Sequence, residues 1–405
     1  MRRWIFLLLL VISSAARADD WKFSFGGATA DGFTPVPADA LYSDSSGYGF
    51  EPPGPSDDKP FYFSVKLPEG NYNVKLVLGD ANAASDTTVK AELRRLMLES
   101  VKTDAGQFVT RTITVNIRTP AIPGGGRVIL KKPREAILEA WAWDDRLTLE
   151  FNGPHPALRT MEITPADVPT VFILGDSTVC DQAAEPWNSW GQMLTRFFKP
   201  GVAVANHAES GETLRSSLHA HRLEKVLSLM KPGDYLFIQY GHNDMKEHGP
   251  GIGPFTSYKT DLAKFVDGAR AKGGIPVLVT SMNRKSMDAS GHIVNTLGDY
   301  PEAVRQLAHE KNVPLIDLNA MSKTLYEAIG PKNLSRAFVD GTHHDAYGSY
   351  ELAKCVVLGI QQNKLDLAKF IVDDWKPFDP AHPDSMDDFD VPPSPKSSTT
   401  KPLGN

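Results

Sequence analysis

Residues 170–178 read Thr-Val-Phe-Ile-Leu-Gly-Asp-Ser-Thr, an apolar run that ends in a polar turn. An unbroken run of apolar and β-branched residues is typical of a strand that is buried on both faces, as in a parallel sheet. The run ends at Gly175, and a helical pattern begins near Trp190. A strand that leads through a turn into a helix is the repeating unit of parallel α/β folds.

The same alternation of short apolar runs and helical patterns continues toward the C-terminus. We expect strands at 170–174, 202–205, 235–238, 276–279 and 313–318, and helices at 190–198, 214–230, 258–272, 301–311 and 346–358. Parallel strands need crossover connections, and these are right-handed. The sequence therefore predicts a three-layer α/β/α fold that resembles flavodoxin in outline.

The chain before residue 165 has a different periodicity. Apolar and polar residues alternate along 61–67, 72–78, 113–117 and 147–151. Period two between Gly- and Pro-rich breaks predicts an antiparallel β-sandwich. We therefore expect two domains, 19–166 and 167–376. The first is a possible carbohydrate-binding domain, because Trp141 and Trp143 could form a sugar-stacking platform, although aromatic side chains more often fill cores.

The two ends of the chain have compositions of their own. Residues 1–18 combine Arg2 and Arg3, an apolar run at 4–12 and the small-residue segment 16–18, which is the pattern of a secretory signal cleaved near Ala18. We therefore expect an exported protein, extracellular or periplasmic. This apolar run is far short of the roughly 20 residues needed to cross a bilayer, and no later run comes close. The segment 377–405 is rich in proline and acids, and it predicts a flexible tail.

Composition excludes several classes of function. The 405 residues include 43 basic and 49 acidic side chains, and the net charge of −6 argues against a general nucleic-acid binder. The 2 cysteines, Cys180 and Cys355, are too few for a disulfide scaffold or a thiolate zinc site, and whether they pair stays open. His219 and His221 would face different directions on a helix. No metal or other cofactor is expected, and the sequence does not set the oligomeric state.

Polar segments follow the expected strands of the second half. They read Gly-Asp-Ser-Thr at 175–178, Asn-His-Ala-Glu-Ser-Gly at 206–211, Gly-His-Asn-Asp at 241–244 and Asp-Gly-Thr-His-His at 340–344. In open α/β sheets, ligands bind beyond the carboxyl ends of the strands, so these segments should converge on one rim. A serine on a tight turn between strand and helix has the exposed hydroxyl that an acyl-transfer nucleophile needs.

Five residues in these segments suit such chemistry. Ser177 is the candidate nucleophile. Asp340 precedes His343 by three residues, so its carboxylate can bind one imidazole nitrogen while the other faces the serine. Gly211 can bring a backbone N–H close to a ligand, and Asn243 offers an amide NH₂ for an oxyanion. Each residue alone has a simpler role as a helix cap or turn residue.

Taken together, the four segments resemble the ordered blocks of the SGNH/GDSL hydrolases over residues 169–362. The resemblance implies a catalytic triad of Ser177, Asp340 and His343, with Ser177, Gly211 and Asn243 forming the oxyanion hole. Thr178 stands where that pattern has leucine. The residues of these four segments further resemble those of the rhamnogalacturonan acetylesterase branch, which includes members with an N-terminal β-sandwich. This implies a serine carbohydrate esterase that removes acetyl groups from pectin through an acetyl-serine intermediate and needs no metal.

The partner expected on this basis is an acetylated, pectic polysaccharide. Arg215 and Arg284 should lie near the rim, where cations could bind uronate carboxylates. His344 would point about 100° away from His343 on a helical turn, so it suits substrate contact or structure. His242 lacks a carboxylate at a short spacing and is not the expected base. Two alternatives remain, namely an acetyl-xylan or lipolytic esterase of the same fold, and an inactive carbohydrate-binding protein.

Overall fold

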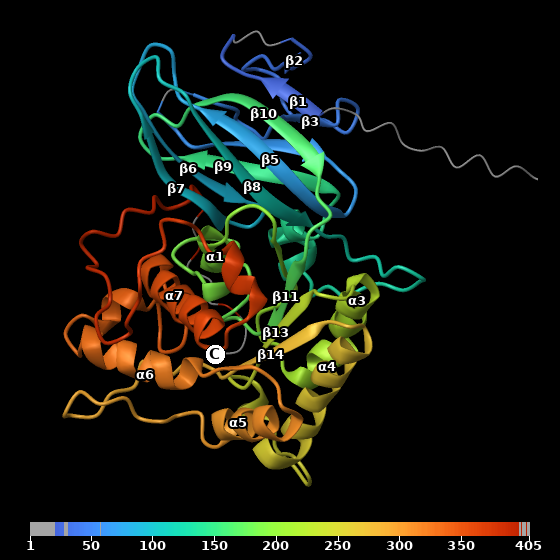
Figure 1. The fold of residues 1–405 in the computed structure, drawn as a ribbon, viewed down its shortest axis with the longest axis vertical. Coiled ribbons are helices and arrows are strands. Elements are labelled where there is room, and N and C mark those ends of the chain that lie inside the picture. Colours follow the sequence, from blue (N-terminus) through green and yellow to red (C-terminus); the bar gives the residue numbers. More distant parts are fainter. Residues whose placement is uncertain (1–20, 28–30, 57, 397, 399–401, 403–405) are drawn as a thin grey trace, which may run out of the picture.

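The computed structural model describes residues 21–27, 31–56, 58–396, 398 and 402. The predicted secretory signal at 1–18 lies outside these residues. The fold is mixed α/β. Figure 1 shows a stack of two sheets built from the first half of the chain beside a third sheet that is flanked by helices and built from the second half.

The third sheet contains the apolar stretch 170–175. Its strand order is β12-β11-β13-β14-β15, and every neighbouring pair is parallel. The strands are β11 (Thr170–Gly175), β12 (Ala203–Asn206), β13 (Tyr235–Gln239), β14 (Ile275–Val279) and β15 (Leu315–Ile316). Renumbered from β11, this is the order 2-1-3-4-5 of flavodoxin-like sheets. All strands therefore end at the same edge.

Helices cover both faces of this sheet because its central strands are apolar throughout. Ile173 and Phe237 pack into one core with α1, α6 and α7, whereas Leu174 and Leu236 pack into a second core with α2 to α5. The helices are α1 (Trp190–Leu194), α2 (Leu214–His219), α3 (Arg222–Leu229), α4 (Lys259–Ala271), α5 (Tyr300–Lys311), α6 (Leu318–Ile329) and α7 (Ala346–Gln362). Short helical turns are η3 (Thr195–Phe197), η4 (Asp244–Lys246), η5 (Pro254–Tyr258), η6 (Leu334–Ala337) and η7 (Asp366–Phe370).

Two elements differ from the pattern expected. The predicted helix 214–230 is broken into α2 and α3, because His221 takes a left-handed conformation with φ of 60°. The predicted strand 313–318 shrinks to β15, because the Asp317 side chain accepts a hydrogen bond from the N–H of Ala320 and begins α6. A short apolar run alone cannot separate a strand from the first turn of a buried helix.

The first half of the chain forms two five-stranded sheets, in the orders β2-β1-β10-β5-β8 and β3-β4-β9-β6-β7. Their strands are β1 (Trp21–Ser24), β2 (Thr34–Pro35), β3 (Tyr48–Phe50), β4 (Phe61–Lys66), β5 (Gly70–Leu78), β6 (Ser85–Ala91), β7 (Arg95–Thr103), β8 (Val109–Ile117), β9 (Arg146–Asn152) and β10 (Leu158–Pro165). All pairs are antiparallel except β1 with β2. Alternate residues such as Phe63 and Leu76 meet in one shared core. The division into two domains near residue 167 stays a prediction.

The proline-rich segment 377–396 packs against the rest of the protein instead of extending away from it as expected. Phe378 and Val391 join the core around α7, and Lys354 pairs with Asp384 at 2.7 Å. Lys90 of β6 donates hydrogen bonds to Pro392 O and Ser394 Oγ. Composition misleads here because a few buried side chains and backbone hydrogen bonds hold an otherwise polar segment.

Within the residues described, the longest apolar helices fall short of what a membrane crossing requires.

Removing the segment after Lys376 should therefore destabilise the protein. Burial of Phe378 and Val391 implies a loss of roughly 2 to 4 kcal/mol in the free energy of unfolding, and a lower thermal midpoint. The comparison is with a chain that ends at Ser398, measured by differential scanning calorimetry. Equal midpoints for the two truncated chains would contradict the packing of this segment.

Candidate active site

Ser177, His343 and Asp340 form one chain of hydrogen bonds at the carboxyl edge of the parallel sheet. Ser177 follows β11, and the other two residues precede α7. His343 Nε2 lies 2.7 Å from Ser177 Oγ, and His343 Nδ1 lies 3.0 Å from Asp340 Oδ2. The side chain of His343 is 1% exposed. The three residues thus lie as a nucleophile, a base and a carboxylate that orients the base.

The loop before α7 holds the carboxylate of Asp340 in its charged form. Its second oxygen accepts the backbone N–H groups of Thr342 and His343, both at 2.7 Å. Partial burial by itself would raise the pKa of Asp340, but the hydrogen bonds from His343 and from the two N–H groups outweigh it, and the pKa falls below its ordinary value. This carboxylate stays ionised at neutral pH.

The candidate oxyanion donors lie on the neighbouring loops. Gly211 has φ of 74°, a conformation that glycine adopts freely. Asn243 Nδ2 donates one hydrogen bond to Glu212 O at 3.1 Å, which holds its amide beside the Gly211 loop. Among the described residues, no hydrogen bond uses the backbone N–H of Ser177 or of Gly211. These N–H groups and the second Asn243 amide hydrogen are available to an oxyanion.

Thr178, which stands where the GDSL pattern has leucine, makes hydrogen bonds that a leucine could not make. Its N–H and hydroxyl donate to Asp176 Oδ1 at 3.0 and 2.7 Å. Its hydroxyl also accepts a hydrogen bond from Gln239 Nε2 of β13 at 2.8 Å. Burial raises the pKa of Asp176 despite these bonds. A threonine therefore ties the turn of Ser177 to the neighbouring strand, where leucine could only pack.

His344 is a core residue, which corrects the expectation that it contacts substrate. It is 1% exposed, and its Nε2 lies 2.7 Å from the hydroxyl of Tyr326. Its ring lies 4.0 Å from that of Phe338. Burial, followed by the charge of His343, lowers the pKa of His344 to about 3. The side chain next to His343 in sequence points into the protein, as the spacing of a turn requires.

His242 is likewise excluded as the base. Burial lowers its pKa well below the ordinary value, with a smaller contribution from Arg284. Its Nε2 faces the sulfur of Met282 at 3.4 Å. Without a carboxylate partner, this neutral imidazole serves the packing of the loop.

The two arginines expected at the rim have different surroundings. Arg284 Nη2 donates to His242 O at 3.1 Å, which places it beside the Asn243 loop. Arg215 is half exposed and faces Glu247 at 3.6 Å and Asp261 at 4.0 Å. The structure brings Arg284 to the candidate site, whereas Arg215 already has carboxylate partners.

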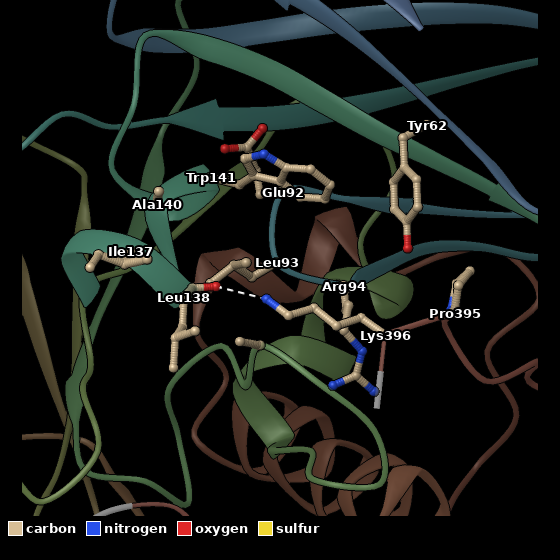
Figure 2. A pocket seen from close by; sticks show the side chains of 11 residues that line it. Tyr62, Glu92, Leu93, Arg94, Ile137, Leu138, Ala140, Trp141, Pro395 and Lys396 are labelled. Atoms are coloured by element: carbon tan, nitrogen blue, oxygen red, sulfur yellow. Dashed lines mark hydrogen bonds between the residues drawn. The ribbon is translucent and has the colours of Figure 1, made fainter. Parts of the chain in front are cut away.

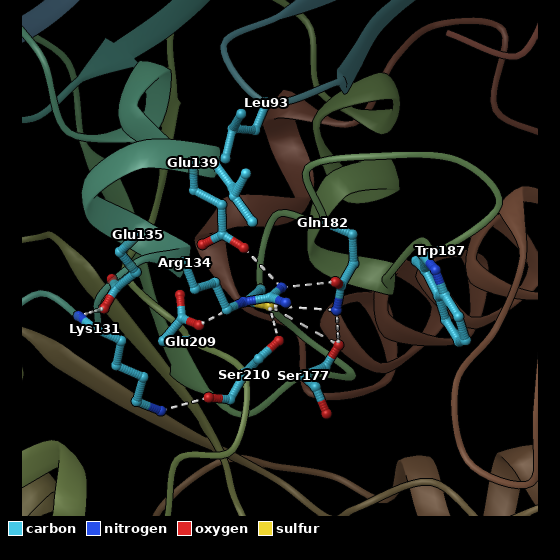
Figure 3. Close-up of polar contacts among 12 residues, drawn as sticks. Leu93, Lys131, Arg134, Glu135, Glu139, Ser177, Gln182, Trp187, Glu209 and Ser210 are labelled. Carbon is cyan, nitrogen blue, oxygen red and sulfur yellow. Dashed lines mark hydrogen bonds and ion pairs between the residues drawn. The ribbon is translucent and has the colours of Figure 1, made fainter. Parts of the chain in front are cut away.

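Three residues of the site gave no signal in the sequence. Gln182 Nε2 donates to Ser177 O at 2.6 Å, and the ring of Trp187 lies 5.9 Å from that of His343. Arg134 reaches this group from the first half of the chain (Figure 3). None of the three belongs to a short motif, so only the folded chain reveals them.

The possible sugar-stacking platform of Trp141 and Trp143 does not form, and Trp143 follows the alternative of a core aromatic. Trp143 is 6% exposed and packs against the guanidinium of Arg118. Trp141 instead lines a cavity of about 450 Å³ with Tyr62, whose ring lies 5.2 Å away. Figure 2 shows these two rings above Lys396, which donates to Leu138 O at 3.0 Å.

Cys180 and Cys355 are buried free thiols. In the described ranges, no cluster of three or more His, Cys, Asp or Glu side chains has an arrangement that could hold a metal ion.

A parallel α/β sheet with a hydrogen-bonded Ser, His and Asp at its carboxyl edge is the arrangement found in serine hydrolases. Residues 173–349 match the GDSL-like lipase/acylhydrolase family. The chain is 41% identical to the rhamnogalacturonan acetylesterase RhgT of Bacillus subtilis over 219 residues, which are 50% of this chain and 94% of RhgT. It therefore belongs to the GDSL/SGNH family of lipases and acylhydrolases.

Similarity to another relative extends over both halves. The uncharacterized esterase YxiM of Bacillus subtilis is 28% identical over 400 residues, which cover 88% of this chain and 97% of YxiM. The crystal structure of YxiM covers 86% of this chain and 99% of its own, at 25% identity and a TM-score of 0.48.

Replacing His344 by leucine tests its place in the core. The substitution leaves the buried hydroxyl of Tyr326 without its partner, so we expect a loss of about 1 to 3 kcal/mol in the free energy of unfolding, measured in urea. The KM for acetylated substrates should stay unchanged. A raised KM with an unchanged free energy of unfolding would indicate that His344 contacts the substrate instead.

Proposed function

We propose that this protein is an acetylesterase that releases acetyl groups from a pectic polysaccharide, rhamnogalacturonan, through an acetyl-serine intermediate on Ser177. The observation that carries the proposal is the hydrogen-bonded chain from Ser177 through His343 to Asp340. The relative named rhamnogalacturonan acetylesterase, with 41% identity, supports the choice of substrate.

The reaction proceeds in two halves. His343 Nε2 takes the proton of Ser177 as the hydroxyl attacks the acetyl carbonyl carbon. The N–H groups of Ser177 and Gly211 and the amide of Asn243 hold the oxyanion. His343 then protonates the departing sugar oxygen, which leaves acetyl-serine. A water molecule gives one proton to His343 and attacks this ester. His343 returns that proton to Ser177 Oγ as the second intermediate collapses, which releases acetic acid and restores the serine hydroxyl.

Two cations beside the site support a uronate-containing substrate. Arg284 lies against the His242 carbonyl, and Lys246 Nζ lies 3.3 Å from Asn243 Oδ1. Burial, together with the other cation, lowers the pKa of Lys246. Neither side chain forms an ion pair with a carboxylate in the part of the chain that the structure describes. A substrate carboxylate would supply the missing counter-charge.

We also propose that the protein is exported. The support is the charged, apolar and small-residue pattern of residues 1–18. A polysaccharide of the plant cell wall would be met outside the cell.

Acetate release from acetylated rhamnogalacturonan, beside acetylated xylan, tests the proposal. We expect a higher kcat/KM on the pectic polymer, and Ser177→Ala should lower kcat by at least about 10³-fold because no other group in the site replaces the nucleophile. Original activity in Ser177→Ala would refute the serine mechanism. A preference for xylan would refute the pectic substrate and leave the mechanism intact.

The cations give a separate test of specificity. Arg284→Gln and Lys246→Met should each raise KM roughly tenfold on acetylated oligogalacturonates, because each loses a charge-assisted contact. Neutral acetylated xylo-oligosaccharides serve as the matched substrate, on which KM should not change. Arg215→Met is the matched variant, since Glu247 already pairs with that arginine. Equal changes in KM on the charged and the neutral substrates would contradict a site that binds substrate carboxylates.

A further inference from the structure

A segment of the first half of the chain leaves its two sheets and contacts the candidate active site. We call residues 129–143 the bridging segment. It contains η1 (Arg134–Leu138) and η2 (Ala140–Ala142). Its Ile129 N–H donates to Ala220 O at 3.1 Å, so the segment also touches the end of α2. Figure 3 shows Lys131 and Arg134 of this segment directed toward residues of the loops that follow β11 and β12.

The guanidinium of Arg134 is the centre of these contacts. Its Nε lies 3.0 Å from Glu209 Oε1, and its Nη2 lies 3.0 Å from Gln182 Oε1. Nη2 also lies 2.7 Å from Glu139 Oε1 within the bridging segment. Only the planar, five-donor fork of arginine can reach three acceptors in different directions at once. Lysine at this position could replace one or two of these bonds.

The two partners outside the segment belong to the two loops that the proposed reaction uses. Gln182 Nε2 donates to the backbone oxygen of Ser177 at 2.6 Å. Glu209 stands two residues before Gly211, and its N–H donates to Gly175 O at 3.1 Å. One guanidinium therefore ties the loop of the nucleophile to the loop of an oxyanion donor.

A neighbouring lysine holds the second loop from the same side. Lys131 Nζ donates to the backbone oxygen of Ser210 and pairs with Glu212 at 2.8 Å. Ser210 and Glu212 flank Gly211 in sequence. The position of the Gly211 N–H thus depends on two cations of the bridging segment.

The carboxylates that Arg134 contacts are buried. The side chains of Glu139 and Glu209 are 3% and 2% exposed, and that of Arg134 is 16% exposed. Burial raises the pKa of both carboxyl groups, and the closeness of Glu139 raises that of Glu209 further. Hydrogen bonds to a charged group in such surroundings are stronger than those in water.

We propose that Arg134 is a positioning residue, which sets the separation of the Ser177 hydroxyl and the Gly211 N–H by bridging Gln182 and Glu209. The inference rests on the proposed serine esterase function. Through Arg134, the first half of the chain becomes a part of the active centre. A misplacement of about 1 Å between reacting groups can cost roughly 10²-fold in rate, so a small relaxation of this bridge would be measurable.

The test compares variants of the full chain on 4-nitrophenyl acetate, a small ester that needs no polysaccharide contacts. Arg134→Met and Arg134→Lys should lower kcat roughly 10- to 100-fold with KM within about twofold. Lys225→Met is the matched control. It removes a cation that also crosses between the halves, to Glu69 at 2.7 Å, but contacts neither loop. Its kcat should stay within about twofold of the original, even if its thermal midpoint falls.

A second variant keeps the test decisive if Arg134→Met fails to fold. Gln182→Met breaks the same bridge without leaving a carboxylate unpaired, and it should lower kcat to a similar extent. Unchanged kcat in both Arg134→Lys and Gln182→Met would overturn the proposal. Equal losses of kcat in Lys225→Met and Arg134→Lys would overturn it as well, because they would indicate a general effect of the interface. Absence of ester hydrolysis in the original chain would instead refute the proposed function.

Discussion

Parallel strands that all end at one edge impose the constraint on which the candidate site depends. Ser177 and His343 are 166 positions apart in the chain, yet their side chains lie 2.7 Å apart because the loops that carry them leave the same edge of one sheet. The sheet is rigid because helices bury both of its faces. Short loops on such a scaffold can hold a hydrogen-bonded triad.

Much of this edge was predictable from the sequence. Continuous apolar runs predicted the parallel strands. The polar segments after these runs predicted the candidate site residues, because each lies at a strand end or at a fixed short spacing. These residues are Ser177, Gly211, Asn243, Asp340 and His343. His344 was ambiguous, since the sequence left open whether its side chain contacts substrate or fills the core. Its hydrogen bond to Tyr326 decides that question.

Contacts between segments far apart in sequence were not predictable. Arg134 and Gln182 belong to no motif, Glu209 lies in the 206–211 segment without a predicted role, and a single sequence does not show that the three meet. The packed segment 377–396 was missed for a similar reason, because its composition resembles that of a disordered tail. The bridging segment lies between strands β8 and β9, and nothing in its sequence distinguishes its charged residues from ordinary surface residues. Its Glu135 in fact pairs with Arg222 at 2.5 Å, with both side chains 0% exposed.

If Ser177 is a nucleophile activated by His343, a fluorophosphonate, which reacts with activated serines, should label it. Mass spectrometry should then find one adduct per chain, on the peptide that contains Ser177, and no adduct when His343 is replaced by alanine. An adduct on another residue, or equal labelling without His343, would show that Ser177 is not activated in this way.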